Sequence, residues 1–232
     1  MRERRPLVLH GVSLDLGASD PLDRDYLRQL AALAERFQPA WLSDHLCWTA
    51  HGNAHLHDLL PLPQTEEAVR HVAARVRATQ DALGRRIAIE NVSSYVRFAG
   101  DALSEGEFLA AIAREADCGI LLDLNNLFVN AHNHGDDADR AVDVLDPARV
   151  FQIHLAGPSV NGALLIDTHD HPVRDEVWAL YERTLAKLGP VSTLIEWDDA
   201  IPAWARVVEE AARARAILAR TCGADASGQA AA

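Results

Sequence analysis

Six short apolar runs along the chain each end in a side chain that can bind a metal ion or transfer a proton. In a parallel sheet the carboxyl ends of the strands meet at one edge, so side chains at those ends are expected to come together. The six run-ending residues are His10, His45, Glu90, Asp123, His154 and Glu196. Two more such groups, Asp167 and His169, lie in the loop that follows the fifth run.

A cluster of this kind favours metal chemistry. Three or four carboxylates that lie close together cannot all stay ionised unless positive charge lies between them. Imidazole and carboxylate donors without thiolates suit Fe, Mn or Zn. Eight donors are more than one ion can use, so the pattern predicts two or three ions.

Asp123 gives the sharpest case, because it follows the buried run "ILL" and is followed by two asparagines. A buried, unpaired carboxylate costs on the order of several kcal/mol, so a compensating cation is expected. Asn125 or Asn126 can offer an amide oxygen to the metal or a hydrogen bond to a ligand. A lone His or Asp at a strand end is more often a helix cap or an ion-pair partner, but repetition at six strand ends favours a metal site.

Other candidates have simpler interpretations. His132 and His134 are interpreted as loop residues or supports for the ligands, with direct ligation as the less favoured alternative. The histidines of "AHGNAHLHDLLPLP" are expected to line the substrate site or to lie in a solvated loop. Cys47 is interpreted as a small buried apolar residue rather than a reactive thiol.

The elements between these residues predict an α/β protein. Near-continuous Val, Ile and Leu runs are typical of parallel strands covered on both faces. Helical patterns alternate with the runs and indicate repeated βα units in one domain over residues 1–221, followed by a disordered tail at 222–232. Six strands are indicated, whereas a closed (β/α) barrel of the common type has eight.

Three helices can be placed by their end signals. One is predicted from the N-cap Thr65 to a stop at Gly84, and another opens with the capping box from Ser104 to Glu107. A third is expected to begin near Pro202 and to bury Trp204.

Composition excludes several function classes. The chain has 232 residues and a net charge of −12, which argues against a nucleic-acid partner. No apolar stretch approaches the length of a membrane span or a secretory signal, so no membrane association is expected. Three widely spaced cysteines suit free thiols in a reducing cytoplasm.

Ordered motifs along the chain resemble a known family. The motifs are "VLHGVSLDLG", "SDHLCW", "HLHDLLPLPQTEE", "IENVSSY", "LLDLNNLFVNAHNHG", "IHLAG", "IDTHDHPV" with "VWALY", and "TLIEWDDAIP". They resemble the multinuclear non-haem iron-dependent oxidative enzymes. These are xylose-isomerase-like TIM barrels that include the methanobactin-forming enzyme and the enzymes that modify bufferin.

The resemblance implies two or three iron ions in a mixed-valent Fe(II)/Fe(III) centre. It implies Glu90, Asp123 and His154 as catalytic residues, with Glu90 bridging. The reaction it implies is O2-dependent oxidation of cysteine in a ribosomally made precursor peptide, which a partner protein presents. The implied iron ligands are His10, His45, Glu90, Asp123, Asn126, His154, Asp167, His169 and Glu196.

Family members usually carry further residues before the "LVLHG" strand, which supply the first two barrel strands. The resemblance therefore implies a barrel that lacks those two strands in this chain. Two alternatives stay open from the residues alone. One is a Zn- or Mn-dependent hydrolase or sugar isomerase on the same barrel, and the other is an inactive metal-binding remnant.

Overall fold

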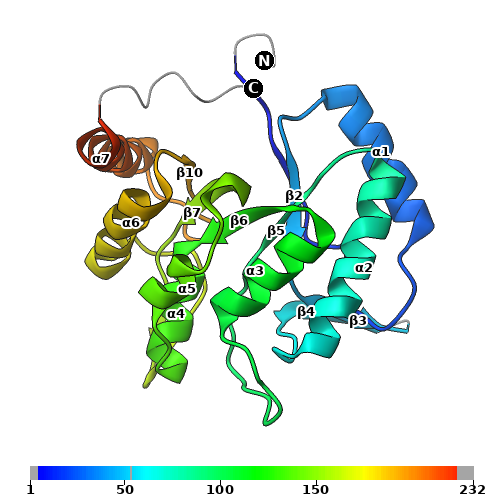
Figure 1. Ribbon diagram of the computed structural model, residues 1–232. Coiled ribbons are helices and arrows are strands. Elements are labelled where there is room, and N and C mark those ends of the chain that lie inside the picture. Colours follow the sequence, from blue (N-terminus) through cyan, green and yellow to red (C-terminus); the bar gives the residue numbers. More distant parts are fainter. Residues whose placement is uncertain (1–4, 53, 224–232) are drawn as a thin grey trace. The chain divides into compact units, whose positions relative to one another are not determined.

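The computed structural model describes residues 5–52 and 54–223, and these residues divide into two compact units. Of the described residues, the first unit comprises 5–52, 54–92 and 96–121, and the second comprises 93–95 and 122–223. Helices separate the strands of the six-stranded sheet along the chain (Figure 1). None of the helices in the described residues is long and apolar enough to cross a membrane.

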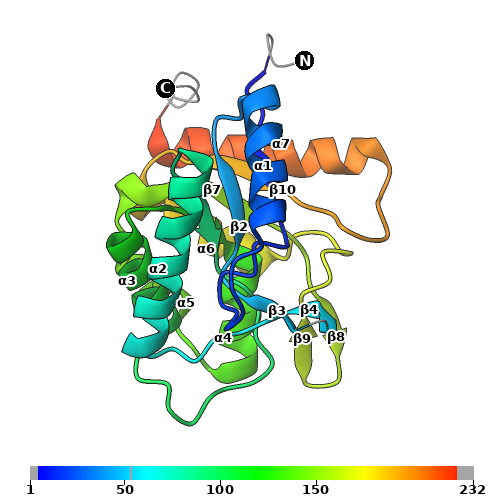
Figure 2. The same ribbon diagram turned by 90° about the vertical axis from the view of Figure 1, so that its right-hand side faces the viewer.

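The first unit holds three parallel strands and the start of a fourth. Their order is β1-β2-β5-β6, and each neighbouring pair is parallel. The strands are β1 (Leu9–His10), β2 (Leu42–His45), β5 (Ala88–Glu90) and β6 (Gly119–Asp123). An antiparallel hairpin follows β2 and consists of β3 (Trp48–His51) and β4 (Ala54–Leu60) (Figure 2).

Three helices of the first unit pack in sequence, with α1 against α2 and α2 against α3 (Figure 1). Their bounds are α1 (Arg24–Phe37), α2 (Glu66–Leu83) and α3 (Glu105–Ala116). The predicted ends of two of them are confirmed. Thr65 caps α2, which stops at Gly84 with φ 63°, and Ser104 and Glu107 form the capping box of α3. Local signals suffice here because caps satisfy backbone groups within one turn.

The second unit continues from β6, which runs from one unit into the other. Strands β7 (Val150–Leu155) and β10 (Ser192–Ile195) pair in parallel, and the six-stranded sheet has the order β1-β2-β5-β6-β7-β10. A second hairpin is formed by β8 (Ser159–Asn161) and β9 (Leu164–Ile166) (Figure 2). The predicted parallel α/β sheet of six strands is therefore confirmed.

The helices of the second unit include one whose buried face differs from the expectation. They are α4 (Leu124–His134), α5 (Ala138–Asp143), the short 3₁₀ helix η1 (Pro147–Arg149), α6 (Asp175–Leu188) and α7 (Trp204–Cys222). Trp204 was expected to be buried in α7, but it is 76% exposed. The buried residues of α7 are Glu210, Ala214 and Ile217. Glu210 is drawn inward because its carboxylate accepts hydrogen bonds from the Val173 N–H and the Trp197 indole.

The expected organisation as one domain over residues 1–221 stays a prediction, as does the absence of two barrel strands. Helix α7 includes Cys222, the first residue of the expected tail. Residues 224–232 lie outside the described residues.

Candidate metal centre

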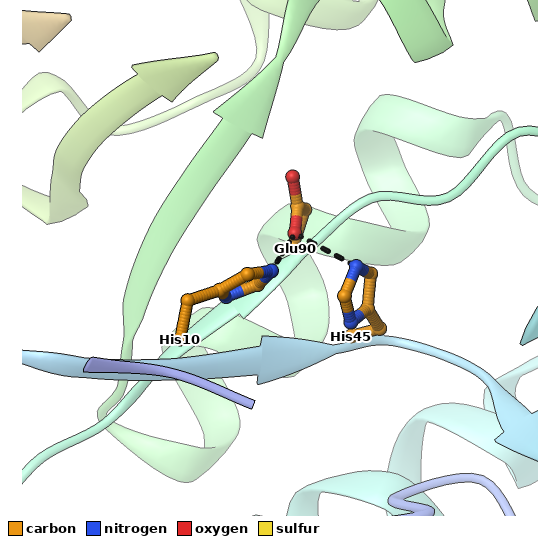
Figure 3. A group of neighbouring side chains, drawn as sticks. All are labelled: His10, His45 and Glu90. Atoms are coloured by element: carbon orange, nitrogen blue, oxygen red, sulfur yellow. Dashed lines mark ion pairs between the residues drawn. The ribbon is translucent and has the colours of Figure 1, made fainter. Parts of the chain in front are cut away.

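Two imidazoles converge on one carboxylate in the first unit. His10 ends β1, His45 ends β2 and Glu90 ends β5, and the parallel register sets His45 beside Glu90. The Nε2 atom of His10 lies 3.0 Å from Glu90 Oε2, and the Nε2 atom of His45 lies 3.2 Å from the same oxygen (Figure 3). The three residues offer ligand atoms within 4.8 Å of one another, so they could hold a metal ion. We call them the first cluster.

The far nitrogen of each imidazole in the first cluster is also held. Nδ1 of His10 lies 2.8 Å from the Ser43 hydroxyl, and Ser43 is paired with His10 in the β1–β2 register. Nδ1 of His45 lies 3.1 Å from the Gly11 carbonyl oxygen. Such partners fix the plane of a ligand ring and choose which nitrogen faces the metal.

The contact between His45 and Gly11 determines which nitrogen of the His45 ring carries a hydrogen. A carbonyl oxygen only accepts, so Nδ1 of His45 must carry the hydrogen. In a neutral ring the Nε2 lone pair would then face the Glu90 carboxylate, and two electron-rich atoms at hydrogen-bond distance repel. A proton or a metal ion must lie between them. The geometry therefore fits a bound cation.

A buried carboxyl group supports the loop around the first cluster. Asp44 is fully buried and accepts hydrogen bonds from the N–H groups of Leu14 and His45. Burial raises the pKa of Asp44 to about 6. Gly11 leaves the space that this carboxyl group occupies, because a Cβ atom there would lie 2.5 Å from Asp44 Oδ2.

A second group lies in the second unit. Asp123 ends β6, His154 lies in β7, and Glu196 directly follows β10. Their ligand atoms lie within 4.8 Å of one another, and Nδ1 of His154 is 3.0 Å from Glu196 Oε2. Asp123 is also the N-cap of α4, since its Oδ1 accepts the N–H of Asn126 at 2.7 Å.

His169 joins this group from the loop after β9. Its Nε2 lies 2.7 Å from Asp167 and 4.0 Å from Asp123, and its Nδ1 lies 3.4 Å from Glu196 and 3.2 Å from Asp198. The backbone of His169 has φ 49°, a left-handed conformation that non-glycine residues seldom adopt. The Asp198 N–H donates to the His169 carbonyl and helps to hold that conformation.

The carboxylates around His169 favour the protonated form of its ring. Burial disfavours the charged ring, but hydrogen bonds to Asp167 and Glu196 outweigh it and raise the pKa of His169 to about 12. Burial likewise opposes ionisation of Glu196, yet contacts with His154 and His169 keep the pKa of this carboxyl below its usual value. A proton on His169 thus supplies part of the positive charge that the surrounding acids require. We call Asp123, His154, Asp167, His169, Glu196 and Asp198 the second cluster.

The predicted ligands therefore fall into these two clusters. His10, His45 and Glu90 lie in the first, and the structure shows two candidate metal groups in the second that share Glu196. Asp167 contacts His169 and accepts a hydrogen bond from Asn125 at 2.6 Å. Asn126 is buried and contributes its N–H to Asp123.

The weaker candidates have other contacts. His132 and His134 lie in the last turn of α4 rather than in a loop. Nε2 of His132 lies 3.1 Å from the Ala163 carbonyl oxygen, and Nε2 of His134 lies 2.8 Å from the Ser94 carbonyl oxygen. Cys47 is buried, and burial raises the pKa of its thiol, so it has the character of a small apolar residue.

Two residues that support the clusters were not predicted. Asp198 belongs to a candidate metal group with His169 and Glu196, and the acidic run "EWDD" was the signal that could have indicated it. Ser43 precedes Asp44 and His45 in β2, and only the register with β1 reveals its role. Sequence spacing alone carries no information on register between distant strands.

Comparison with solved structures defines the class of fold. The IolI protein with a bound zinc atom matches 94% of this chain and 77% of its own, with a TM-score of 0.60 and 12% identity. D-psicose 3-epimerase in the presence of D-fructose matches 94% of this chain and 79% of its own, with a TM-score of 0.56 and 12% identity. The protein thus has a xylose-isomerase-like TIM-barrel fold, as expected.

Sequence comparison shows the family. The model of the RiPP precursor modification enzyme family MbnB/TglH/ChrH matches residues 1–219, and the chain belongs to this family. A UPF0276 protein of an Anaeromyxobacter species is 52% identical over 219 residues, which cover 94% of this chain and 77% of that protein. A UPF0276 protein of Caulobacter vibrioides is 52% identical over 202 residues, which cover 87% of this chain and 72% of that protein. The family resemblance stated from the motifs is confirmed.

Proposed function

We propose that this chain is an iron-dependent oxidase that uses O2 to modify cysteine in a ribosomally made precursor peptide. Membership of a family of precursor-modifying enzymes supports the peptide substrate. The observation that carries the metal is the first cluster, where two imidazole nitrogens face one carboxylate oxygen at 3.0 and 3.2 Å. Imidazole and carboxylate donors are the set that non-haem iron uses.

Three of the proposed ligands, His10, His45 and Asp123, are oriented by other parts of the chain. Ser43 and the Gly11 carbonyl orient the rings of the first cluster, and the start of α4 orients Asp123. Bound iron supplies one-electron chemistry with O2 and a position for a thiolate sulfur. We propose two or three ions, held by His10, His45, Glu90, Asp123, Asn126, His154, Asp167, His169 and Glu196.

The residues of the chain have defined tasks in this proposal. Glu90, Asp123 and Glu196 balance the charge of the metal ions, and His154 and His169 hold Glu196 from two sides. His169 must release its proton when a cation enters the second cluster, and Asp198, whose side chain is 64% exposed, offers that proton a route to solvent. Positioning the peptide sulfur beside the metal then places the adjacent C–H bond in reach.

The sulfur in this reaction comes from the peptide. Cys47 and Cys118 are buried, and Cys222 is half-buried at the end of α7. Burial raises the pKa of the Cys47 thiol, so this residue is a poor metal ligand in the folded chain. The chain therefore offers little competition to a cysteine that a partner protein presents.

Mass spectrometry of the peptide tests this function. The chain would be produced with a Cys-containing precursor encoded beside its gene and with the neighbouring partner protein, with and without O2. We expect the peptide mass to fall by hydrogen or a carbon fragment only with iron and O2. A Cys→Ser peptide is the matched control, and equal modification of it would exclude sulfur as the organising ligand.

A divalent-metal hydrolase or epimerase is the second candidate. It is favoured by the fold, which the chain shares with a zinc-bound protein and with sugar epimerases. Reconstitution with Zn, Mn or Fe separates the two functions. Turnover with Zn or Mn in the absence of O2 would favour the second candidate, whereas O2 uptake with Fe alone favours the first.

A further inference from the structure

A groove of about 1350 Å³ runs between α1 and α2 in the first unit. It is lined by α1, by α2 and by the turns beside them, from Pro21 to Gln38 and from His71 to Arg85. No proposed metal ligand lines it. The groove is thus a feature separate from the first cluster, and the metal chemistry leaves it unexplained.

Small side chains keep the groove open. Ala74, Ala78 and Ala82 follow one another at every fourth position of α2, so they lie along one side of that helix. All three are exposed, and Ala31 and Ala32 face the groove from α1. An apolar path without bulky side chains can receive another segment of polypeptide.

The charges along the groove are mostly positive. Four arginines line it, and Glu35 is the only acidic residue among the lining residues. This contrasts with the whole chain, which carries a net charge of −12. The four lining arginines are Arg24, Arg28, Arg75 and Arg85.

Two of these arginines are fixed in place by backbone oxygens. The Arg75 guanidinium donates to the carbonyls of Asp20 at 2.6 Å and Asp15 at 3.0 Å. Arg85 donates to the Pro39 carbonyl at 2.8 Å. Neutral carbonyls orient a guanidinium but do not cancel its charge, although the nearby carboxylates of Asp15 and Asp20 offset part of the charge of Arg75.

The other two arginines lie near the start of α1. Arg24 is exposed, and Arg28 pairs with Asp25 at 2.5 Å, with both side chains more than 70% exposed. A pair so exposed is screened by water and exchanges partners at little cost. An incoming carboxylate can therefore recruit both arginines.

We propose that this groove docks an acidic segment of the precursor peptide. The inference rests on the proposed function for the identity of the peptide, but the charge and shape of the groove define the segment. The distance from His71 to Arg85 along α2 is roughly 20 Å, which matches about six extended residues. The net charge of −12 on the chain would repel a long polyanion such as nucleic acid. It would also repel a second copy of this chain, which carries the same negative charge.

Charge reversal tests the groove in the full chain. The probe is a fluorescein-labelled 12-residue peptide of alternating Glu and Ala, and binding is measured by fluorescence anisotropy. The groove variant is Arg24→Glu with Arg28→Glu. The control is Arg36→Glu with Arg70→Glu, which changes two exposed arginines of the same helices outside the groove by the same charge. We expect affinity to fall at least about tenfold for the groove variant only, and wild-type binding to weaken with salt.

Several results would overturn the proposal. Equal losses in both variants would indicate general electrostatics, and no binding to the wild type would exclude an acidic occupant. A wild-type dimer that the groove variant abolishes in sedimentation velocity would make the groove a contact between copies. Circular dichroism confirms that each variant is folded.

Measurements on the precursor separate this proposal from the proposed function. If both hold, the groove variant keeps its iron content and its kcat, whereas KM rises for a precursor with an acidic segment and stays unchanged for one whose acids are replaced by Gln. Glu/Ala probe binding in the groove without iron-dependent modification would leave the groove correct and the oxidase wrong. Modification that is insensitive to the groove variant would leave the oxidase correct and the groove wrong.

Discussion

The first and second clusters both bring imidazole and carboxylate groups together, but they differ in net charge. The first has two imidazoles and one carboxylate, Glu90. The second has His154 and His169 against four carboxylates, and His169 alone contacts all four within 4.0 Å. The first cluster can be balanced by one proton, whereas the second has an excess of negative charge even when His169 is protonated. The excess negative charge of the second cluster therefore favours a bound cation more strongly. In the first cluster, neutral partners, the Ser43 hydroxyl and the Gly11 carbonyl, hold the two imidazole rings in place.

The largest expected effect comes from removing the only carboxylate of the first cluster. Glu90→Gln keeps the side-chain shape but removes the charge that faces both imidazoles. We expect the loss of at least one iron per chain by elemental analysis and a fall in kcat that exceeds the roughly 10–100-fold typical of residues that only support a ligand. Glu176→Gln, an exposed change in α6, is the control. Full iron content in Glu90→Gln would remove the first cluster from the metal site.

The second cluster is tested by comparing two of its acids. Glu196 belongs to two candidate metal groups and Asp198 to one. Glu196→Gln should therefore release more metal than Asp198→Asn, which retains the contacts of Glu196 with both histidines. Metal content at several free iron concentrations gives the comparison. The reverse order would show that Asp198 is the stronger ligand.

A smaller effect is expected from the hydroxyl that orients His10. Ser43→Ala removes the contact at 2.8 Å but no ligand. We expect metal affinity to fall about 10–100-fold, because the ring loses its fixed orientation, with a change of only about 1 kcal/mol in the free energy of unfolding. Titration with Co²⁺ followed by absorbance measures the affinity, and Ser43→Thr should restore it. If Ser43→Thr binds as weakly as Ser43→Ala, packing around position 43 rather than the hydroxyl explains the effect.

The smallest effect is expected at an ion pair outside both clusters. Arg183 donates to both carboxylate oxygens of Asp139, and this contact lowers the pKa of Asp139 below 3.8. A lowered pKa stabilises the folded state above the unfolded-state value, and that stabilisation is lost as the pH falls through the folded-state pKa. Asp139→Asn should cost about 0.5 kcal/mol at pH 7, since the pair is largely exposed. Urea unfolding at pH 7 and pH 3 should show the difference shrinking in acid, and a larger difference at pH 3 would contradict the assignment.

The sequence predicted the parts of the molecule that depend on local signals. Caps at Thr65 and Ser104 act within one helical turn, so their positions were correct. The apolar runs placed His10, His45 and Glu90 at strand ends, and the parallel register then brought them together.

Features that depend on distant contacts were not predictable in the same way. Trp204 fits the apolar pattern of its helix, yet the buried face of α7 is set by contacts of Glu210 with Val173 and Trp197. The help that Ser43 gives to His10 depends on strand register, and the groove depends on how α1 and α2 pack. The ligand roles themselves stay a prediction until metal is measured.

Asp123 has a mechanical consequence for the second cluster. It is the last residue of β6 and the N-cap of α4, with no loop between the strand and the helix. One carboxylate oxygen accepts the Asn126 N–H, so the other oxygen is the one that can bind a metal without competing with the helix cap. A metal ion that displaces the Asp123 side chain therefore also displaces the cap of α4. We therefore expect metal binding and release to change the hydrogen-exchange rate of the backbone N–H groups in the first turn of α4.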